Sequence, residues 1–242
     1  MNTATACDLK ILLVFAALNS EKEAVQSSVD HWTQNCPRAL QSTAYEKIIV
    51  ECIGVRGNRL RQVLPQYAHQ RVAGVIVAGV AGALAPELGV GDLIIDSQST
   101  DAQRVGDFMN AMSTPRPVRV GLIHTAKHMV CTVKAKQVLH QQTNALAVEM
   151  ENAYTHALAD RRHVPWLGIR SISDTAFEEV SPQVVHFVDS VGSLRPWDFT
   201  WSLARRPMLI PQLIRLGKNT HSATKQLSDA IGAVIRSGWP FQ

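Results

Sequence analysis

The sequence predicts a three-layer α/β/α domain with a mixed, largely parallel central sheet, and three observations support this fold class. Apolar runs of strand length alternate with segments of helical periodicity, as in a sheet covered by helices on both faces. Hydrophobic residues make up 46% of the chain and charged residues only 18%, so a sizeable core can be buried. No repeat or low-complexity linker interrupts the 242 residues, which we take as a single domain, residues 1–242.

Strands are expected where short apolar or β-branched runs end in glycine or charged residues. They are residues 9–18, 47–52, 72–78, 92–96, 121–123, 145–148 and 164–169. Helices are expected where apolar residues recur every three or four positions, the first with Asn19 or Ser20 as its cap. They are residues 21–32, 58–68, 134–142 and 152–162, followed by 198–205, 208–217 and 221–236. Residues 187–242 are thus expected to form a basic helical extension packed on the domain.

The composition excludes several classes of protein. No apolar stretch approaches the roughly 20 residues that span a bilayer, and residues 11–18 lack a following cleavage site and indicate a buried strand. The four cysteines show no C-x-x-C pairing, so we expect reduced thiols in a cytoplasmic protein: Cys7, Cys36, Cys52 and Cys131. The nine histidines form no ligand set, since His124 and His128 have no third partner, and we expect no metal.

The positive charge is concentrated at the C-terminal end. The net charge is +4, and from Arg195 onward seven Arg and Lys residues stand against two Asp. Such a stretch can contact a membrane, an acidic partner or nucleic acid, or it can be a solvated face. Aromatic residues interleaved with the arginines would suit peripheral membrane contact: Trp197, Phe199, Trp201, Trp239 and Phe241. The alternative is that Trp197 and Trp201, four residues apart, pack on the core or on a subunit interface. We do not expect a nucleic-acid partner.

Charged residues end two of the predicted strands, where an open α/β sheet binds its ligands. The run at residues 145–148 breaks into Glu149, Met150 and Glu151, and the run at residues 164–169 breaks into residues 170–174. A glycine-rich segment, residues 79–86, follows the strand at residues 72–78, and its small side chains let the backbone approach a ligand closely. These three segments are the candidate parts of a small-molecule site.

Taken together, the segments resemble the nucleoside phosphorylase/nucleosidase superfamily, which includes purine nucleoside phosphorylase, methylthioadenosine/S-adenosylhomocysteine nucleosidase and futalosine hydrolase. The matching segments appear in the family's order: residues 16–21, 78–86, 90–92, 147–151 and 170–174. The tail, in residues 203–207 and 211–217, is similar to that of hopanoid-associated phosphorylases, which remove adenine from adenosylhopane. The resemblance implies that an N-glycosidic bond is cleaved, without an organic cofactor, by a homo-oligomer such as a dimer or hexamer.

The resemblance implies a proton donor for the leaving base. Cleavage makes the purine anionic, so the base must be protonated, most easily at N7, and Asp174 is the candidate acid, oriented by Ser173. Burial would raise the pKa of an aspartate with this role. The alternative interpretation is that Asp174 caps a helix.

The resemblance also implies the groups around the sugar. Glu151 would hold the ribose 2′-hydroxyl beside the developing oxocarbenium ion, and Met150 would cover the sugar face. By strand alternation Glu149 lies on the opposite face and is interpreted as structural. A first-turn Glu151 in solvent, favoured by the helix dipole, is the alternative.

The resemblance also implies that Glu21 is the base that directs the attacking water. Glu23 is the alternative if the loop aligns with the family two residues further along. Backbone contacts to substrate are expected from the glycine-rich segment, whose residues here are Val80, Ala81 and Gly82. Val80 replaces the serine of methylthioadenosine-type nucleosidases.

Two other segments match the family less well. The Gly-Asp-Pro-x-Arg segment of hexameric phosphorylases is missing after the first strand, and Arg56 is the substitute for phosphate binding. Met129 and Val130 fall where a base-stacking segment belongs, with core packing as the alternative. Inorganic phosphate as a co-substrate therefore stays open.

The predicted function is cleavage of an adenine nucleoside with a bulky, adenosylhopane-like 5′ substituent, by hydrolysis or phosphorolysis. A methylthioadenosine/S-adenosylhomocysteine or futalosine hydrolase is the alternative enzyme. A degenerate nucleoside-binding module is the alternative that is not an enzyme.

Overall fold

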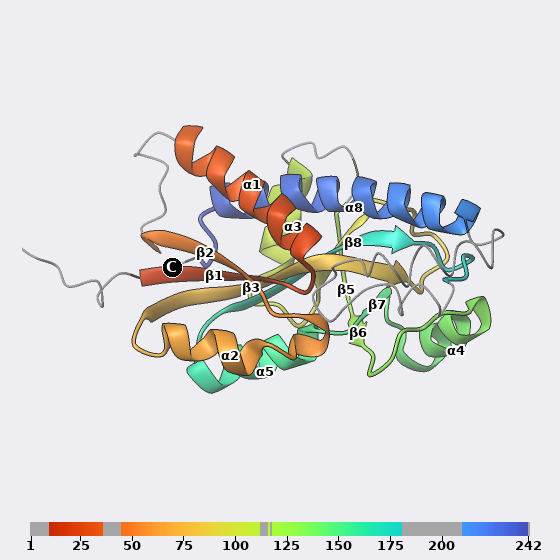
Figure 1. Cartoon of the computed structure of the whole chain (residues 1–242), viewed down its shortest axis with the longest axis horizontal. Helices are drawn as coiled ribbons and strands as arrows, with labels where there is room; N and C mark the ends of the chain where they lie inside the picture. The colour runs from red at the N-terminus through yellow and green to blue at the C-terminus, as the bar shows by residue number, and fades with distance from the viewer. Residues whose placement is uncertain (1–9, 36–44, 112–115, 117, 181–209, 242) are drawn as a thin grey trace, which may run out of the picture.

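A mixed, largely parallel sheet forms the centre of the structure (Figure 1). The structure is a computed structural model that describes residues 10–35, 45–111, 116, 118–180 and 210–241. In this part the strands are β1 (Lys10–Ala16), β2 (Lys47–Cys52), β3 (Arg71–Ala83), β4 (Leu93–Asp96), β5 (Val118–Gly121), β6 (Ile123–Thr125), β7 (Ala147–Glu149) and β8 (Trp166–Asp174). Their order is β2-β1-β3-β8-β4-β5, and β7 pairs with both β3 and β6. The β3–β7 and β4–β8 pairs are antiparallel and the others parallel, so the predicted sheet type is confirmed.

Helices cover both faces of the sheet. They are α1 (Asn19–Asn35), α2 (Leu60–Val63), α3 (Ala102–Ala111), α4 (Val133–Thr143), α5 (Asn152–Arg162) and α8 (Ile210–Arg236). Two 3₁₀ turns flank α2, Val55–Gly57 and Leu64–Tyr67. In Figure 1, α1 and α8 lie above the sheet and α2 and α5 below it, which is the predicted three-layer arrangement.

The pleat of β1 explains the two cores. Leu12 and Val14 face a cluster that includes α8 Leu227, whereas Leu13 and Phe15 face a second cluster with α2 and α5. Because alternate side chains of a strand point to opposite faces, a strand buried on both sides is apolar throughout, as β1 is. Burying one large apolar side chain stabilises the fold by about 1.5–3 kcal/mol.

Two strands are longer than predicted, and both extensions carry site residues. β3 continues through residues 79–83 to Ala83, so the glycine-rich segment is strand and not a turn after the strand. β8 continues from Ile169 to Asp174 and is buried over its whole length. The small residues of β3 and the polar residues of β8 are not typical of strands, so these extensions were not predicted. The two strands are neighbours and pair with each other. Asp174 ends a strand and the helix-cap alternative does not apply.

The C-terminal part differs from the expected helices. α8 is one continuous helix where two were expected, so Gly217 lies inside the helix and does not end it. A Cβ at Gly217 would meet no atom within 4 Å, so no close packing requires a glycine there. The helix packs against α1, α3, β3, β4 and β8. The helix expected at residues 198–205 and the segment at residues 187–195 lie outside the described residues. None of the helices in the described ranges is long and apolar enough to cross a membrane.

The aromatic residues near the chain end do not all form a surface. Trp239 is fully buried, its ring lies against Gly74 and its indole N–H donates to the carbonyl of Thr100. Phe241 packs under the guanidinium of Arg104. The membrane-facing interpretation is therefore wrong for Trp239, which is a core residue, and for Trp197, Phe199 and Trp201 it falls outside the described residues.

Candidate active site

The candidate site lies where the carboxyl ends of β1, β3 and β8 meet. These strands are parallel neighbours, so their ends share one edge of the sheet, the edge at which open α/β sheets bind ligands. In the β3–β8 pairing Gly79 lies opposite Arg170, and Gly82 opposite Asp174. β7 then runs antiparallel to the end of β3 and brings Glu149 back toward the same edge. The three separate segments of the sequence thus converge.

Glu21 is held in the site by the start of α1. Its Oε2 accepts the backbone N–H groups of Ala17 and Leu18, both at 3.0 Å, as a glutamate in the first turn does when it caps its own helix. Its Oε1 accepts the backbone N–H of Val80 at 2.8 Å. Glu21 is 2% exposed, so it is a buried carboxylate of the site.

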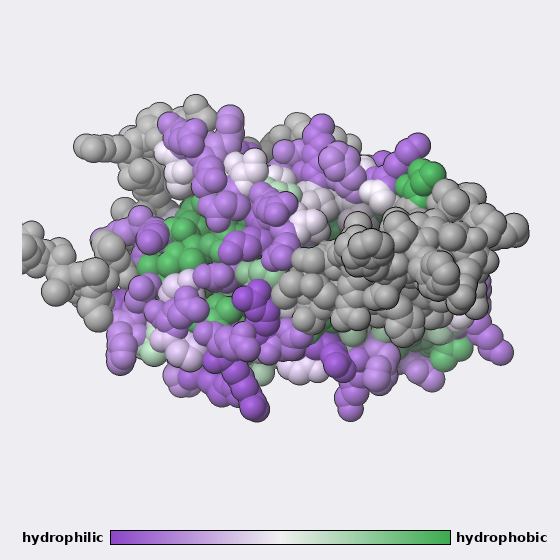
Figure 2. All heavy atoms as spheres, in the orientation of Figure 1, coloured by the Kyte–Doolittle hydropathy of each residue, from purple (hydrophilic) through white to green (hydrophobic). Residues whose placement is uncertain are grey.

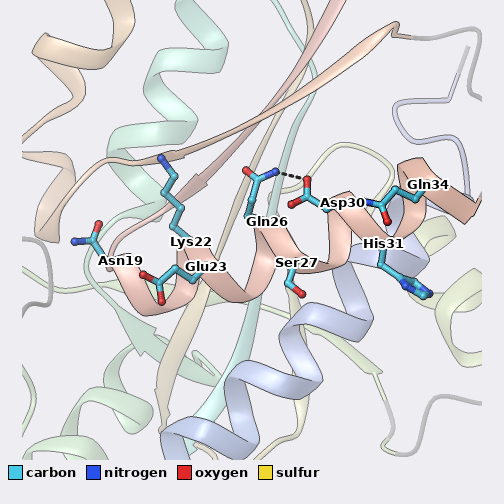
Figure 3. A pocket seen from close by; sticks show the side chains of 8 residues that line it. All are labelled: Asn19, Lys22, Glu23, Gln26, Ser27, Asp30, His31 and Gln34. Atoms are coloured by element: carbon cyan, nitrogen blue, oxygen red, sulfur yellow. Dashed lines mark hydrogen bonds between the residues drawn. The ribbon is translucent and has the colours of Figure 1, made fainter.

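Glu23, the alternative base, points elsewhere. It is exposed and lines a hollow of about 690 Å³ along the outer face of α1 (Figure 3). The hollow is polar throughout its described lining, which includes Asn19, Lys22 and Asp30, and the molecular surface over α1 is mostly hydrophilic (Figure 2). The carboxylates at the strand ends do not line it. This geometry favours Glu21 over Glu23.

Arg170 is the centre of the charged cluster, a role that the sequence analysis missed. It is fully buried, and its Nη2 donates to Glu149 Oε2 at 2.5 Å and to Asn152 Oδ1 at 2.8 Å. The amide of Asn152 donates in turn to Asp96 Oδ2 at 2.8 Å, so β4 helps to orient the guanidinium. Arg170 Nη1 has no hydrogen-bond partner among the described residues although it is buried. Leaving such a donor unpaired is costly, so Nη1 is an unmet hydrogen-bonding group at the centre of the cluster.

Gly79 allows this convergence. A Cβ at that position would collide with Arg170 Nη1 and would lie 2.9 Å from Glu21 Oε1. The unpaired donor of Arg170 and the carboxylate of Glu21 therefore meet over the backbone of β3, where any residue other than glycine would fill the space between them.

Glu151 approaches the cluster from the turn after β7. Its Oε1 accepts the backbone N–H of Arg56 at 3.0 Å, and its Oε2 lies 3.5 Å from Arg170 Nη2. It is 5% exposed, so it is not a solvated first-turn glutamate. Glu149 contacts the same guanidinium, so the prediction that it lies on an opposite face is wrong, since residues two positions apart in an extended chain share a face. Its Oε2 also accepts the N–H of Glu151 at 2.6 Å, which agrees with its structural interpretation.

Arg56 reaches the site through its backbone only. Its φ of 57° is left-handed, and this turn presents the N–H to Glu151. The guanidinium is exposed, and its Nη1 donates to the carbonyl of Lys127 at 3.4 Å. This position of the Arg56 side chain does not support its interpretation as a phosphate ligand.

Burial raises the pKa of two carboxyl groups in the cluster, Glu21 and Glu151. Burial raises the pKa of Glu21, against the lowering effect of Arg170 and of the backbone N–H groups that Glu21 accepts. Burial raises the pKa of Glu151 to about 7, with Arg170 opposing it and the nearby charges of Glu149 and Glu21 adding to it. A buried glutamate that titrates near neutrality fits a functional role better than a structural one.

Asp174 lies at the other end of the site, at the end of β8. It is 8% exposed, and its Oδ1 lies 2.7 Å from the hydroxyl of Ser173, which also lies 3.2 Å from the carbonyl of Ala81. Ser173 therefore does contact Asp174, as expected. The other carboxylate oxygen, Oδ2, receives a hydrogen bond from Lys136 of α4, a residue that the sequence analysis did not single out.

The glycine-rich part of β3 lines the gap between the two ends of the site. Val80 and Gly82 are half-buried, whereas Ala81 is buried in a core cluster on the opposite face, as strand alternation requires. A Cβ at Gly82 would lie 3.0 Å from Asp174 Oδ2. Of the three residues expected to contact substrate, Ala81 can offer only its backbone.

The other expected substrate contacts are placed less clearly. Met150 is half-buried beside Glu151, and Met129 is 44% exposed. Val130 packs against a core cluster that contains Leu84 and Val148, which favours the core-packing alternative for Val130.

The pKa of Glu151 predicts opposite effects of pH on stability and on activity. Because its folded-state pKa, about 7, exceeds its ordinary 4.5, the folded protein binds a proton more tightly than the unfolded chain. This contribution to stability is present below pH 4.5 and is lost as pH rises toward 7 and above. From pH 5 to pH 8, the unfolding free energy of the wild type should fall by about 1–2 kcal/mol more than that of Glu151→Gln. Denaturant titration of both proteins at the two pH values measures this difference. Wild-type kcat/KM should fall below about pH 7, where Glu151 loses its charge.

The exposed Glu179 offers the matched control. Glu179→Gln should keep the wild-type dependence of stability on pH. An unchanged pH dependence in Glu151→Gln would contradict the buried, neutral-titrating carboxylate.

Comparison with known proteins identifies similar sequences and folds. The model of the phosphorylase superfamily matches residues 102–195, a stretch that contains Lys136, Glu149, Glu151 and Arg170. This match and the fold confirm the resemblance to the nucleoside phosphorylase/nucleosidase superfamily, a class of enzymes that cleaves N-glycosyl bonds. No curated protein matches the chain in sequence.

Solved structures share the fold over nearly the whole chain. A structure described as a 5′-methylthioadenosine/S-adenosylhomocysteine nucleosidase of Borrelia burgdorferi B31, bound to adenine, has a TM-score of 0.66 at 15% identity and covers 93% of this chain and 99% of its own. Futalosine hydrolase of Helicobacter pylori strain 26695 has a TM-score of 0.61 at 15% identity, covering 95% and 98%. The nucleosidase of Neisseria meningitidis, in complex with methylthio-immucillin-A, has a TM-score of 0.62 at 15% identity, covering 95% and 100%. At identities this low, the structural similarity establishes a common fold.

Proposed function

We propose that this chain hydrolyses the N-glycosidic bond of an adenine nucleoside that carries a bulky 5′ substituent. The observation that supports the proposal best is the convergence of Glu21, Glu151 and Arg170 at one end of the site with Asp174 at the other. Cleavage of a nucleoside needs negative charge at one end of the site and a proton donor at the other, because positive charge develops on the ribose and negative charge on the leaving base.

Asp174 donates a proton to the leaving base. The carboxyl group keeps a small exposed area at the end of β8, and Ser173 fixes one of its oxygens. A proton on N7 of adenine makes the base neutral as it departs, which removes the charge that would otherwise oppose bond cleavage. General acid catalysis of this kind contributes about 10²–10⁴-fold.

The buried carboxylates act on the sugar. Glu151 accepts the 2′-hydroxyl of the ribose and places negative charge beside the oxocarbenium ion, with Met150 next to it. Preorganised charge in a site with little water is among the largest contributions to catalysis. Glu21 accepts a proton from the attacking water, and the buried guanidinium of Arg170 lies beside the Glu21 carboxylate over Gly79.

Charge favours water over phosphate as the nucleophile. Three buried carboxylates surround a single buried guanidinium, and two of the three hold it at 2.5 and 3.5 Å. A phosphate dianion would need several free cationic or hydroxyl donors, yet Arg56 presents its backbone to the site and its side chain to Lys127. Repulsion by the carboxylates would oppose phosphate binding and would leave neutral water unaffected.

The 5′ substituent is proposed from two sources. Residues 203–207 and 211–217 are similar to the tail of hopanoid-associated phosphorylases and favour an adenosylhopane-like group. The shared fold of the nucleosidases and futalosine hydrolase favours the alternative of a small thio-substituted or futalosine-type nucleoside. A homo-oligomer and peripheral membrane contact through the C-terminal tail are part of the proposal, and sedimentation velocity with and without liposomes tests both.

A substrate panel tests the proposed function. Adenine release should be measured by chromatography from adenosine, methylthioadenosine, S-adenosylhomocysteine, aminodeoxyfutalosine and adenosylhopane, each with and without phosphate. We expect adenosylhopane to be cleaved fastest, at a rate that phosphate does not change. Faster cleavage of the thio-nucleosides would show that they, and not adenosylhopane, are the substrates. A rate that depends on phosphate would contradict the proposal of hydrolysis.

A further inference from the structure

Lys136 is a buried charge that the proposed reaction does not yet use. It lies in α4 and is fully buried. Its Nζ donates to Asp174 Oδ2 at 2.5 Å, to the carbonyl of Thr175 at 2.7 Å and to the carbonyl of Glu178 at 3.0 Å. Only an ammonium group has three N–H donors, since a neutral amine has two. The three acceptors thus hold Lys136 as a fixed positive charge beside Asp174.

The two oxygens of Asp174 are not equivalent. Oδ2 faces the ammonium, which offers donors only, so a proton on Oδ2 would point at another proton-bearing group. Oδ1 faces the hydroxyl of Ser173, which can accept from Oδ1 while it donates to the carbonyl of Ala81 at 3.2 Å. The proton of a protonated Asp174 therefore belongs on Oδ1, with every neighbouring group still paired.

We infer that Lys136 is a positioning residue for the acid: it confines the transferable proton to Asp174 Oδ1 and balances the charge that proton transfer leaves behind. The inference rests on the proposed function. The O–H bond at Oδ1 breaks as an N–H bond forms on the purine, and the electron pair of the C1′–N9 bond moves into the base. Asp174 is left as a carboxylate in contact with a cation that was already in place, and solvent returns a proton after the base departs.

A purely structural role is the competing explanation. Lys136 also holds the carbonyls of Thr175 and Glu178 and so fixes the loop after β8. A structural defect would lower every activity of the site together. Loss of the proposed role would lower only reactions in which the leaving group needs a proton, so the two explanations differ in a measurable ratio.

The test compares two leaving groups in Lys136→Met. The adenine nucleoside needs protonation, whereas p-nitrophenyl riboside has a leaving group that departs as a stable anion. We expect kcat/KM for the adenine nucleoside to fall about 100-fold and that for p-nitrophenyl riboside to change less than about threefold. Lys134→Met, an exposed lysine in the same helix, should leave both unchanged. An equal fall on both substrates, or no fall on either, would overturn the inference.

A double variant keeps the test valid if Lys136→Met does not fold. Lys136→Met with Asp174→Asn removes both charges and leaves no unpaired buried carboxylate. Because Lys136 is inferred to act through Asp174, the double variant should match Asp174→Asn alone on both substrates. A further loss relative to Asp174→Asn would refute the inference. Failure of the wild type to cleave any riboside would instead refute the proposed function, so the two failures are distinguishable.

Discussion

Asp174→Asn is expected to slow adenine release about 10²–10⁴-fold, because asparagine has no acidic proton to give to the leaving base. The amide is close in shape to the carboxyl group, and its oxygen can still accept from Lys136 and leave the end of β8 in place. The loss should therefore fall on kcat, measured by steady-state adenine release, while the dissociation constant for adenine changes little.

The control for this variant is Asp160→Asn, at a side chain of α5 that is 68% exposed. It should retain the wild-type rate. If Asp174→Asn kept more than about a tenth of the wild-type kcat, Asp174 would not be the acid.

Glu21→Gln is expected to give the second large effect, a loss of about 10²–10³-fold in kcat/KM. The glutamine amide cannot accept a proton from water, and its NH₂ group would face the backbone N–H groups that the carboxylate now accepts. A modest fall in the midpoint of thermal unfolding should accompany the kinetic loss, because a buried donor is left without an acceptor.

Glu23, two residues further along α1, offers a matched control. Glu23→Gln changes an exposed group on the outer hollow of α1 and should affect neither rate nor stability. Equal losses in Glu21→Gln and Glu23→Gln would contradict the assignment of the base, and a loss confined to Glu23→Gln would reverse it.

The sequence could predict the fold class because its apolar runs are nearly continuous. β2 and α5 begin and end at the expected residues, 47–52 and 152–162. The ends of β3 and β8 could not be predicted from composition, since glycine and charged residues usually end a strand. Here the polar residues Arg170 and Asp174 face Gly79 and Gly82 on the neighbouring strand, and only the pairing of the two strands makes such a sequence favourable.

The residues of the candidate site were found where a local motif carries them. Glu21, Glu151, Ser173 and Asp174 come from short segments, and these residues lie at one edge of the sheet. Lys136 lies on a helix with an ordinary sequence. It shares the inward face with Leu139, His140 and Thr143 at helical spacing, a pattern that shows the direction of its side chain. The pattern does not reveal its partner, which comes from another element 38 residues away.

The role of Arg170 shows a different limit. Its position in the motif was visible in the sequence. Its contacts with Glu149, Glu151 and Asn152 depend on the turn after β7, and its guanidinium also lies against Gly79. Residues two positions apart in a strand share a face, so the expectation that Glu149 and Glu151 lie on opposite faces was wrong. Turn geometry of this kind is set by tertiary contacts, which composition does not report.

Isotope transfer from water shows whether water is the nucleophile that cleaves the N-glycosidic bond. The wild-type protein should be incubated with an adenine nucleoside in ¹⁸O-labelled water with phosphate present, and both products analysed by mass spectrometry. We expect free adenine without label and a free sugar with one ¹⁸O at C1′, in equal amounts. A sugar 1-phosphate without label would contradict attack by water, and adenine-nucleoside binding without release of adenine would contradict cleavage itself.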